Sequence, residues 1–400
     1  MTDKAKTPEF PMPRAAECPF DPAPELARQA PVSRVRLWDG STPWLITRYA
    51  DVRALLADPR VSVDVTWPGF PHTNAVSKAR DARMKTLMQL DAPEHTAQRR
   101  LLTADFTIRR MTALRPRIQR IADELVDELL TGPKPADLVA AFALPLPSLV
   151  ICELLGVPYA DRDFFQRVAH TLVMDEPDPE QAMAASEELN AYLEDLVAAK
   201  AAKPADDLLS RLAVEQFRTG AMTRREIAVL GQLLMVAGHD TTTAMIALGV
   251  AALFAQPDQL RAVRDGDREL VANAVEELLR YLSITHTEAR RVAREDLEIG
   301  GTLIRAGEGI IAVKSTANRD PAAFPDPGTL DVHRRARHHV AFGYGAHQCL
   351  GQGLARVELR IAYHTLFRRL PALAPALPLE RLVYKENAVF YGVRELPVTW

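Results

Sequence analysis

The sequence predicts a mainly α-helical protein with small β-structured segments near both ends. After about residue 50, most segments place apolar residues at three- to four-residue intervals, which is the period of an amphipathic helix. Near the N-terminus, the extended segments "PVSRVRLW" and "TPWLITRY" flank the turn residues Asp39 and Gly40. Near the C-terminus, "EDLEIGGTLIRAGEGIIAV" alternates and breaks at glycines, as a hairpin does.

The composition excludes several classes of protein. The chain has 400 residues, 48% of them hydrophobic, and a net charge of −3, so it can bury a large core and carries no strongly basic stripe for nucleic acid. Its three cysteines, Cys18, Cys152 and Cys349, lie far apart and fit neither a disulfide framework nor a paired-cysteine zinc site. "MTDKAKTPEFPMPRAAECPF" lacks the apolar stretch of a secretory signal, so we expect a cytoplasmic protein.

Helices are predicted over "DVRALLAD", "TALRPRIQRIADELVDELL", "EELNAYLEDLVAAKAA" and the final "GLARVELRIAYHTLFRRL". Between the hairpin and this last helix, "NRDPAAFPDPGTLDVHRRARHH" predicts a proline-rich meander. Residues 60–90 keep no steady period, so they are expected to be irregular. Such a segment is either part of a functional site or a plain surface loop.

The longest predicted helix begins at a capping box formed by Thr223 and Glu226. It continues for about 30 residues, or about 45 Å. His239 and Asp240 at its centre argue against a membrane span, because an aspartate there costs about 2.5–3.5 kcal/mol. Gly238 and the polar residues that follow it either form a kink with self-satisfied hydrogen bonds or handle a polar ligand.

"FGYGAHQCLG", residues 342–351, carries the most specific signal in the chain. Gly343 and Gly345 permit backbone angles that a side chain forbids, so the loop can double back before Cys349. Cys349 is predicted to stand at the start of the last helix, where the helix dipole favours thiolate over thiol. A thiolate in such a loop suits a single-ligand metal centre or a nucleophile.

This stretch resembles the signature Phe-Gly-x-Gly-x-His-x-Cys-x-Gly of the cytochrome P-450 family of haem-thiolate monooxygenases. The matching residues are Phe342, Gly343, Gly345, His347, Cys349 and Gly351. The resemblance extends over essentially the whole chain and implies one catalytic domain over residues 1–400, a helical triangular prism with a small β-rich region. It places haem b (iron protoporphyrin IX) between the central helix and the cysteine-bearing helix, with Cys349 as the axial thiolate ligand and its electron donation favouring oxygen activation.

Two further motifs match the family. Glu277 and Arg280 of "EELLR" resemble its buried Glu-x-x-Arg pair, with Arg334 as the implied third member. In addition, His95 and Arg99 of "APEHTAQRR" resemble donors to one haem propionate, and Arg291 and His347 resemble donors to the other. Arginine suits this role because its planar fork can bond both carboxylate oxygens.

"AGHDTT" resembles the family's central-helix motif. The resemblance assigns Asp240 and Thr241 to proton delivery beside a widened helix turn. It assigns Ala237 and Gly238 to the space above the iron and gives His239 no role.

The implied reaction inserts one oxygen atom from O2 into an apolar C–H or C=C bond of a small organic molecule, as a hydroxylation or an epoxidation. Phrases such as "GVPYADRD" and "STANRD" resemble soluble actinobacterial members that modify secondary metabolites and foreign compounds. Electrons would come from NAD(P)H through a ferredoxin reductase and a ferredoxin. The protein is expected to be a monomer that binds no membrane and no nucleic acid.

The family's pocket-lining regions correspond here to residues 60–90, 165–200, 284–287 and 387–390. The individual candidates are Leu234, Ala237, Ile284, Thr287, Val389 and Phe390, whose mixture predicts a mostly apolar pocket with a few polar contacts. The resemblance also implies a ferredoxin-docking face, with Arg109, Arg110, Arg334, Arg335, Arg337, Arg356 and Arg360 as candidates.

Three other functions are alternatives to this one. Nitric oxide reductases share the fold but lack the acid–alcohol pair that Asp240 and Thr241 supply. A peroxygenase would need no reductase. A haem-binding sensor or carrier would have no turnover.

Overall fold

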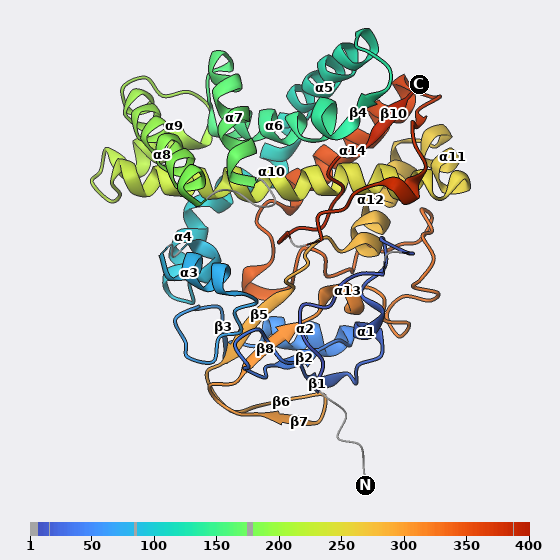
Figure 1. The fold of residues 1–400 in the computed structure, drawn as a ribbon. Helices are drawn as coiled ribbons and strands as arrows, with labels where there is room; N and C mark the ends of the chain where they lie inside the picture. The colour runs from blue at the N-terminus through green and yellow to red at the C-terminus, as the bar shows by residue number, and fades with distance from the viewer. Residues whose placement is uncertain (1–6, 16, 84–85, 174–178, 387) are drawn as a thin grey trace. The chain divides into compact units, whose positions relative to one another are not determined.

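The computed structural model describes residues 7–15, 17–83, 86–173, 179–386 and 388–400. The fold is mainly helical with small sheets, as predicted (Figure 1). The chain divides into two compact units, each built from two separate segments. The first unit comprises Met1–Arg100 and Glu276–Leu350, and the second comprises Leu101–Val275 and Gly351–Trp400.

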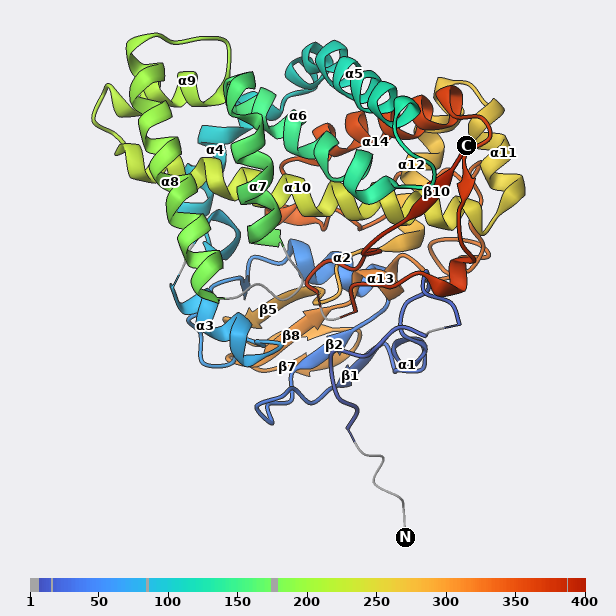
Figure 2. The ribbon, with the colours of Figure 1, turned by 45° about the horizontal axis from the view of Figure 1, so that its top comes forward.

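The first unit contains a five-stranded sheet with the order β1-β2-β8-β5-β3, most of which is visible in Figure 2. Its strands are β1 (Val32–Arg34), β2 (Trp44–Ile46), β3 (Val61–Ser62), β5 (Ala289–Ala293) and β8 (Gly309–Ala312). β2 and β8 pair in parallel, and the other neighbours are antiparallel. All four residues of β8 are buried, as expected for the central strand.

The predicted C-terminal hairpin is confirmed as β6 (Leu297–Ile299) and β7 (Thr302–Ile304). Gly300 and Gly301 turn the chain between these strands with positive φ angles. The remaining helices of this unit are α1 (Pro24–Ala27), α2 (Tyr49–Ala57), α3 (Ala75–Arg83) and α13 (Lys314–Ala317). Along the chain, α4 (Glu94–Thr103) leads from the first unit into the second, and α12 (Arg268–Leu282) leads back.

The second unit is organised around α10 (Arg224–Phe254). Three helices that lie beside α10 in Figure 1 pack on it, namely α6 (Pro145–Leu155), α8 (Pro179–Ala202) and α14 (Gln352–Arg369). Its other helices are α5 (Ile108–Thr131), α7 (Arg162–Val173), α9 (Leu208–Leu212) and α11 (Pro257–Asp265). A three-stranded sheet in the order β4-β10-β9 completes it, with β4 (Ala136–Asp137), β9 (Ala374–Pro375) and β10 (Pro397–Thr399).

The predicted capping box starts α10. The Glu226 carboxylate accepts the Thr223 N–H at 2.7 Å, and the Thr223 hydroxyl accepts the Glu226 N–H at 3.2 Å. The helix then runs for 31 residues. It is long and apolar enough to cross a membrane, but 61% of its most apolar window is buried within the protein. This burial against α6, α8 and α14 is that of a core helix.

The prediction that residues 60–90 are irregular is wrong for part of that segment. Among its described residues, β3 pairs with β5, and α3 occupies Ala75–Arg83. The start of α3 is capped by Asn74, whose side chain accepts the Ser77 N–H at 2.7 Å. Few apolar residues mark this helix, so its periodicity was hidden. Residues 84–85 lie outside the described part.

Candidate active site

The cysteine loop is closed by a backbone hydrogen bond from the Cys349 N–H to the Phe342 carbonyl at 2.9 Å. Gly343 and Gly345 adopt φ angles of +73° and +75°, which glycine accommodates without strain. A methyl group on Gly345 would lie 2.2 Å from the carbonyl oxygen of Leu56 in α2. The loop therefore lies so close to α2 that only glycine fits at this position.

Cys349 lies three residues before the first residue of α14, and Gly351 is the N-cap of that helix. The location near a helix start is as predicted, and it favours the thiolate. The other two cysteines differ in chemistry, because burial raises the pKa of Cys152 to about 12 and also raises the pKa of Cys18. Both therefore stay protonated at neutral pH, which leaves Cys349 as the candidate thiolate.

Four donors predicted from the sequence belong to the same unit as this loop. Arg99 donates to the carbonyl of Gln348 at 2.7 Å, directly beside Cys349. The rings of His95 and His347 lie 4.0 Å apart, measured between their centroids. Arg291 of β5 donates to the carbonyl of Arg290 at 2.8 Å.

The charges of this cluster follow from its burial. Burial and the neighbouring Arg291 lower the pKa of His347 to about 3, and burial and Arg99 also lower the pKa of His95. Burial lowers the pKa of Arg291 to about 10, so its guanidinium stays charged at neutral pH. The result is two cations and two neutral imidazoles, a donor set that fits a ligand carrying carboxylates.

Sequence reasoning missed two charged residues that hold the approach to β5. Glu288 has a φ angle of +54°, unusual for a residue with a side chain. Its carboxylate accepts the backbone N–H groups of Lys314 and Ser315 at 2.7 and 3.2 Å. The pKa of Glu288 is raised above its ordinary value, because the effect of burial outweighs the opposing effect of the Lys314 ammonium. This turn sets where β5 begins, and hence where Arg291 lies, but no local pattern in the sequence marks it.

The predicted structural pair is fully buried in the first unit. Arg280 donates to both carboxylate oxygens of Glu277 at 2.7 Å, and Arg334 donates to the same carboxylate at 3.1 Å. Arg280 also donates to the carbonyls of Asn318 and Pro327 at 2.9 Å each. These bonds connect α12 to the predicted meander and satisfy the buried guanidinium.

The polar turn of α10 lies in the second unit. The Thr241 hydroxyl donates to the carbonyl of Ala237, and the Thr243 hydroxyl donates to that of His239, both at 2.8 Å. The widened turn that the resemblance implies beside Asp240 and Thr241 does not interrupt α10, which is α-helical from Arg224 to Phe254. The threonine hydroxyls bond to carbonyls one turn earlier, and the backbone stays α-helical across both positions.

Two side chains of this turn are held by other elements of the second unit. His239 is fully buried, and its Nδ1 forms a 2.6 Å hydrogen bond with the hydroxyl of Ser148 in α6. Asp240 lies 3.8 Å from the ammonium of Lys385, measured from carboxylate oxygen to Nζ. Neither partner was predicted, since each contact joins residues far apart in the sequence.

The candidate pocket residues divide between the two units. Leu234 and Ala237 are half-buried and lie three residues apart on α10. Ile284 and Thr287 are half-buried in the first unit, before β5. In the C-terminal segment, Val389 is exposed and Phe390 is half-buried, whereas residue 387 lies outside the described part. The same holds for residues 174–178 of the predicted 165–200 region.

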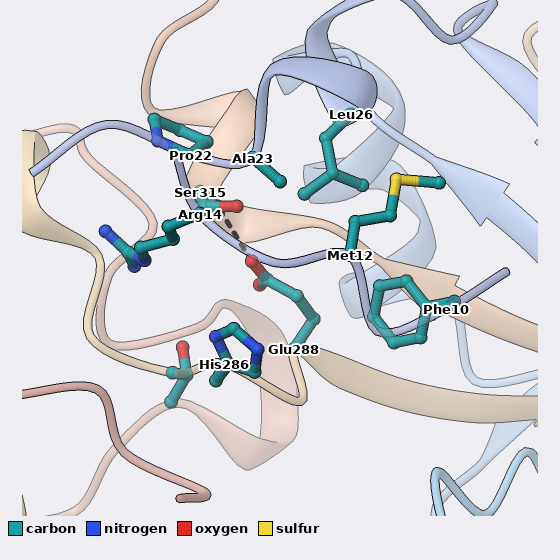
Figure 3. A pocket seen from close by; sticks show the side chains of 10 residues that line it. Phe10, Met12, Arg14, Pro22, Ala23, Leu26, His286, Glu288 and Ser315 are labelled. Carbon is teal, nitrogen blue, oxygen red and sulfur yellow. Dashed lines mark hydrogen bonds between the residues drawn. The ribbon is translucent and has the colours of Figure 1, made fainter. Parts of the chain in front are cut away.

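One cavity of the first unit lies next to the 284–287 segment but is not a substrate pocket. Figure 3 shows Arg14, His286 and Glu288 around it, with Phe10 and Met12 on another side. Its volume is about 20 Å³, which is room for about one water molecule. Arg14 donates to the carbonyl of Ser283 at 2.8 Å and thereby holds the N-terminal segment against this turn.

A single cysteine in a glycine loop, beside donors for carboxylates, is typical of a haem-thiolate protein. The family model described as Cytochrome P450 matches residues 35–375, which include segments of both units. This chain belongs to the cytochrome P450 family, whose members are haem-thiolate monooxygenases. Family membership and the mainly α fold were both predicted from the sequence.

Similar proteins come from actinobacteria. Cytochrome P450 GfsF of Streptomyces halstedii is 51% identical over 399 residues, covering 98% of this chain and 96% of that protein. Its crystal structure matches with a TM-score of 0.95, covering 98% of this chain and 100% of that chain. Pentalenic acid synthase of Streptomyces avermitilis is 48% identical, and the match covers 97% of this chain and 96% of that protein. Mycinamicin VIII C21 methyl hydroxylase of Micromonospora griseorubida is 42% identical, and the match covers 94% of this chain and 95% of that protein.

Proposed function

We propose that this protein inserts one atom of O2 into a C–H or C=C bond of a mostly apolar secondary metabolite or foreign compound. The observation that carries the proposal is the acid–alcohol pair Asp240 and Thr241 on the central helix of a chain that also has the complete cysteine loop. The names of pentalenic acid synthase and mycinamicin VIII C21 methyl hydroxylase support a secondary metabolite as the substrate. Screening a metabolite library for a spin-state change in the haem spectrum would identify compounds that bind.

The residues of the first unit fit haem b. Cys349 would supply the axial thiolate, and His95, Arg99, Arg291 and His347 would hold the two propionates. Haem, when bound, supplies the iron at which dioxygen is activated. The protein's contribution would be to keep the thiolate in the hydrogen-bonded cysteine loop and to offset the carboxylates with the half-buried cations Arg99 and Arg291.

Asp240 and Thr241 would move protons toward the reacting oxygen. An apolar pocket cannot supply protons, so an acid and a hydroxyl at adjacent positions of α10 would carry them with water. The Thr241 hydroxyl donates to the carbonyl of Ala237, and its oxygen can accept a further hydrogen bond. Leu234 and Ala237 would contribute the apolar wall beside this pair.

We expect Thr241→Ala to bind haem and substrate normally but to lose most reducing equivalents to peroxide, because the hydroxyl that steers protons is gone. Asp240→Asn should slow product formation about a hundredfold, since general acid–base groups contribute at least that much. The measurement is product formed per NADPH consumed, together with the melting temperature.

Thr243→Ala is the matched control, since its hydroxyl makes the same type of bond to a carbonyl one turn earlier. That variant should lose stability but not coupling. A fully coupled Thr241→Ala protein with a lowered melting temperature would show that the turn is structural. Turnover with peroxide but none with NADPH and redox partners would identify a peroxygenase, and none with either would identify a sensor or carrier.

Electron supply from a ferredoxin would depend on exposed cations. Of the seven candidate arginines, Arg334 is bound to Glu277, and Arg356 and Arg360 are half-buried. Arg109 and Arg110 are both exposed, and Arg110 pairs with Asp206. Arg335 and Arg337 are exposed in the meander and suit an acidic partner better.

The double charge reversal Arg335→Glu and Arg337→Glu is expected to lower the ferredoxin-dependent rate about five- to tenfold at low salt. Rising salt should slow the unaltered enzyme, because exposed charges are screened. The difference in rate between the unaltered enzyme and the double variant should therefore become smaller. The rate is followed by NADPH oxidation with a ferredoxin and its reductase. Arg261→Glu, at an exposed arginine outside the candidate set, is the control. A rate unchanged by the double reversal would exclude this docking face.

We further propose that residues 1–400 act as one catalytic domain and as a cytoplasmic monomer. The family match supports the single domain, because it includes segments from both compact units.

A further inference from the structure

Lys385, in the second unit, is a cation close to Asp240, the proposed proton-delivery acid. Its Nζ lies 3.8 Å from an Asp240 carboxylate oxygen. The two side chains are only 17% and 16% exposed, so water screens their attraction less than at a surface pair. Lys385 is 145 residues from Asp240 in sequence and belongs to none of the family motifs described for this chain.

The backbone that carries Lys385 is fixed as the base of a hairpin. The Lys385 N–H donates to the carbonyl of Gly392 at 2.8 Å, and the neighbouring Tyr384 and Val393 form an antiparallel bridge. The rings of Tyr384 and Tyr391 stack with their centroids 5.5 Å apart. Lys385 therefore extends from a braced segment and not from a loose end.

This hairpin base lies directly against α10. A methyl group on Gly392 would come within 3.3 Å of the Ala244 Cβ atom, a tighter contact than side chains usually make. Ala244 is four residues after Asp240, so the two lie on the same face of the helix. Because Gly392 pairs with Lys385, the hairpin contacts this face at two points, one by close packing and one by charge.

We propose that Lys385 is a positioning residue for Asp240. The Lys385 ammonium would hold the Asp240 carboxylate in the orientation needed to pass protons toward the substrate. The proposal rests on the proposed function, in which Asp240 delivers protons. The same hairpin carries Val389 and Phe390, the candidate substrate contacts. The rate of proton delivery would then depend on the position of this hairpin against α10. A substrate that contacts the hairpin would change the orientation of the Asp240 carboxylate through Lys385.

Lys385→Met tests the role, because methionine keeps an unbranched chain but removes the charge. We expect kcat for the compound selected by the spectral screen to fall about tenfold, since misplacing a catalytic group slows the reaction without removing it. Haem content and the spectral Kd for that compound should change less than about twofold. The melting temperature should change by no more than a few degrees. Lys385→Arg should recover most of the rate, and Arg381→Met, at an exposed cation four residues earlier, should have none of these effects.

A double-mutant cycle with Asp240→Asn separates this role from others. If Lys385 acts through Asp240, Lys385→Met should have little further effect in the Asp240→Asn background. A further tenfold loss there, or a loss confined to substrate binding, would overturn the inference while leaving the proposed function intact. If Asp240→Asn alone is fully active and coupled, the proposed function of the acid fails, whatever Lys385→Met does.

Discussion

Cys349→His is expected to abolish oxygenation and to move the absorption band of the reduced carbon-monoxide complex from the thiolate-specific position to that of histidine ligation. The reason is that the thiolate is the only anionic ligand that the cysteine loop offers, and a neutral imidazole cannot donate the same electron density. The measurement is the difference spectrum of the reduced protein with and without carbon monoxide, with haem content determined separately.

Cys152→Ala is the matched control for this variant. Its thiol is buried in α6, and burial raises its pKa to about 12, so it cannot act as a thiolate ligand at neutral pH. The control should keep the thiolate band and lose only some stability through the small cavity that remains. An unaltered spectrum in Cys349→His, or a lost band in Cys152→Ala, would refute the assignment of the ligand.

Arg280→Met is expected to lower the free energy of unfolding by about 3–5 kcal/mol, because it leaves the Glu277 carboxylate buried without its main counter-charge. It also removes the donor to the carbonyls of Asn318 and Pro327. The meander that leads to the cysteine loop should loosen as a result. Urea unfolding followed by circular dichroism measures the loss, and haem retention reports on the loop.

Two further variants test whether charge is the cause. Glu277→Gln in the Arg280→Met background removes the uncompensated charge and should recover part of the lost stability. Arg335→Met removes an exposed cation from the meander and should change stability little. A loss below about 1 kcal/mol in Arg280→Met would show that the buried pair contributes little to folding.

The features that were predictable from the sequence are those with a local cause. The capping box of Thr223 and Glu226 marks the start of α10, and apolar spacing marks its length. Glycines at positions 343 and 345 mark the cysteine loop, because residues with a side chain rarely adopt their positive φ angles. The Glu277–Arg280 pair is visible for a similar reason, since three-residue spacing places both on one helical face.

The features that were not predictable depend on contacts between distant segments. Helix α3 has too few apolar residues to show a period, so only its cap at Asn74 could have indicated it. Lys385 and Glu288 look like ordinary surface charges in the sequence. Only the fold brings Lys385 close to Asp240, and Glu288 close to Lys314. The resemblance implied a widened turn in the central helix, but α10 is α-helical from Arg224 to Phe254.

The interleaving of segments in the first unit has a consequence for biosynthesis. β1 and β2 can form their hairpin soon after they leave the ribosome, but the other edge of β2 pairs with β8, where Ile46 meets Ala312. At about 5–20 residues per second, the roughly 266 residues from Ile46 to Ala312 take about 13–53 s to translate. Throughout that interval Leu45 and Ile46, which are fully buried in the finished sheet, stay on an open strand edge. The yield of folded protein in a host cell should therefore depend on chaperones that cover this edge, and on slow growth at low temperature, which limits aggregation of nascent chains.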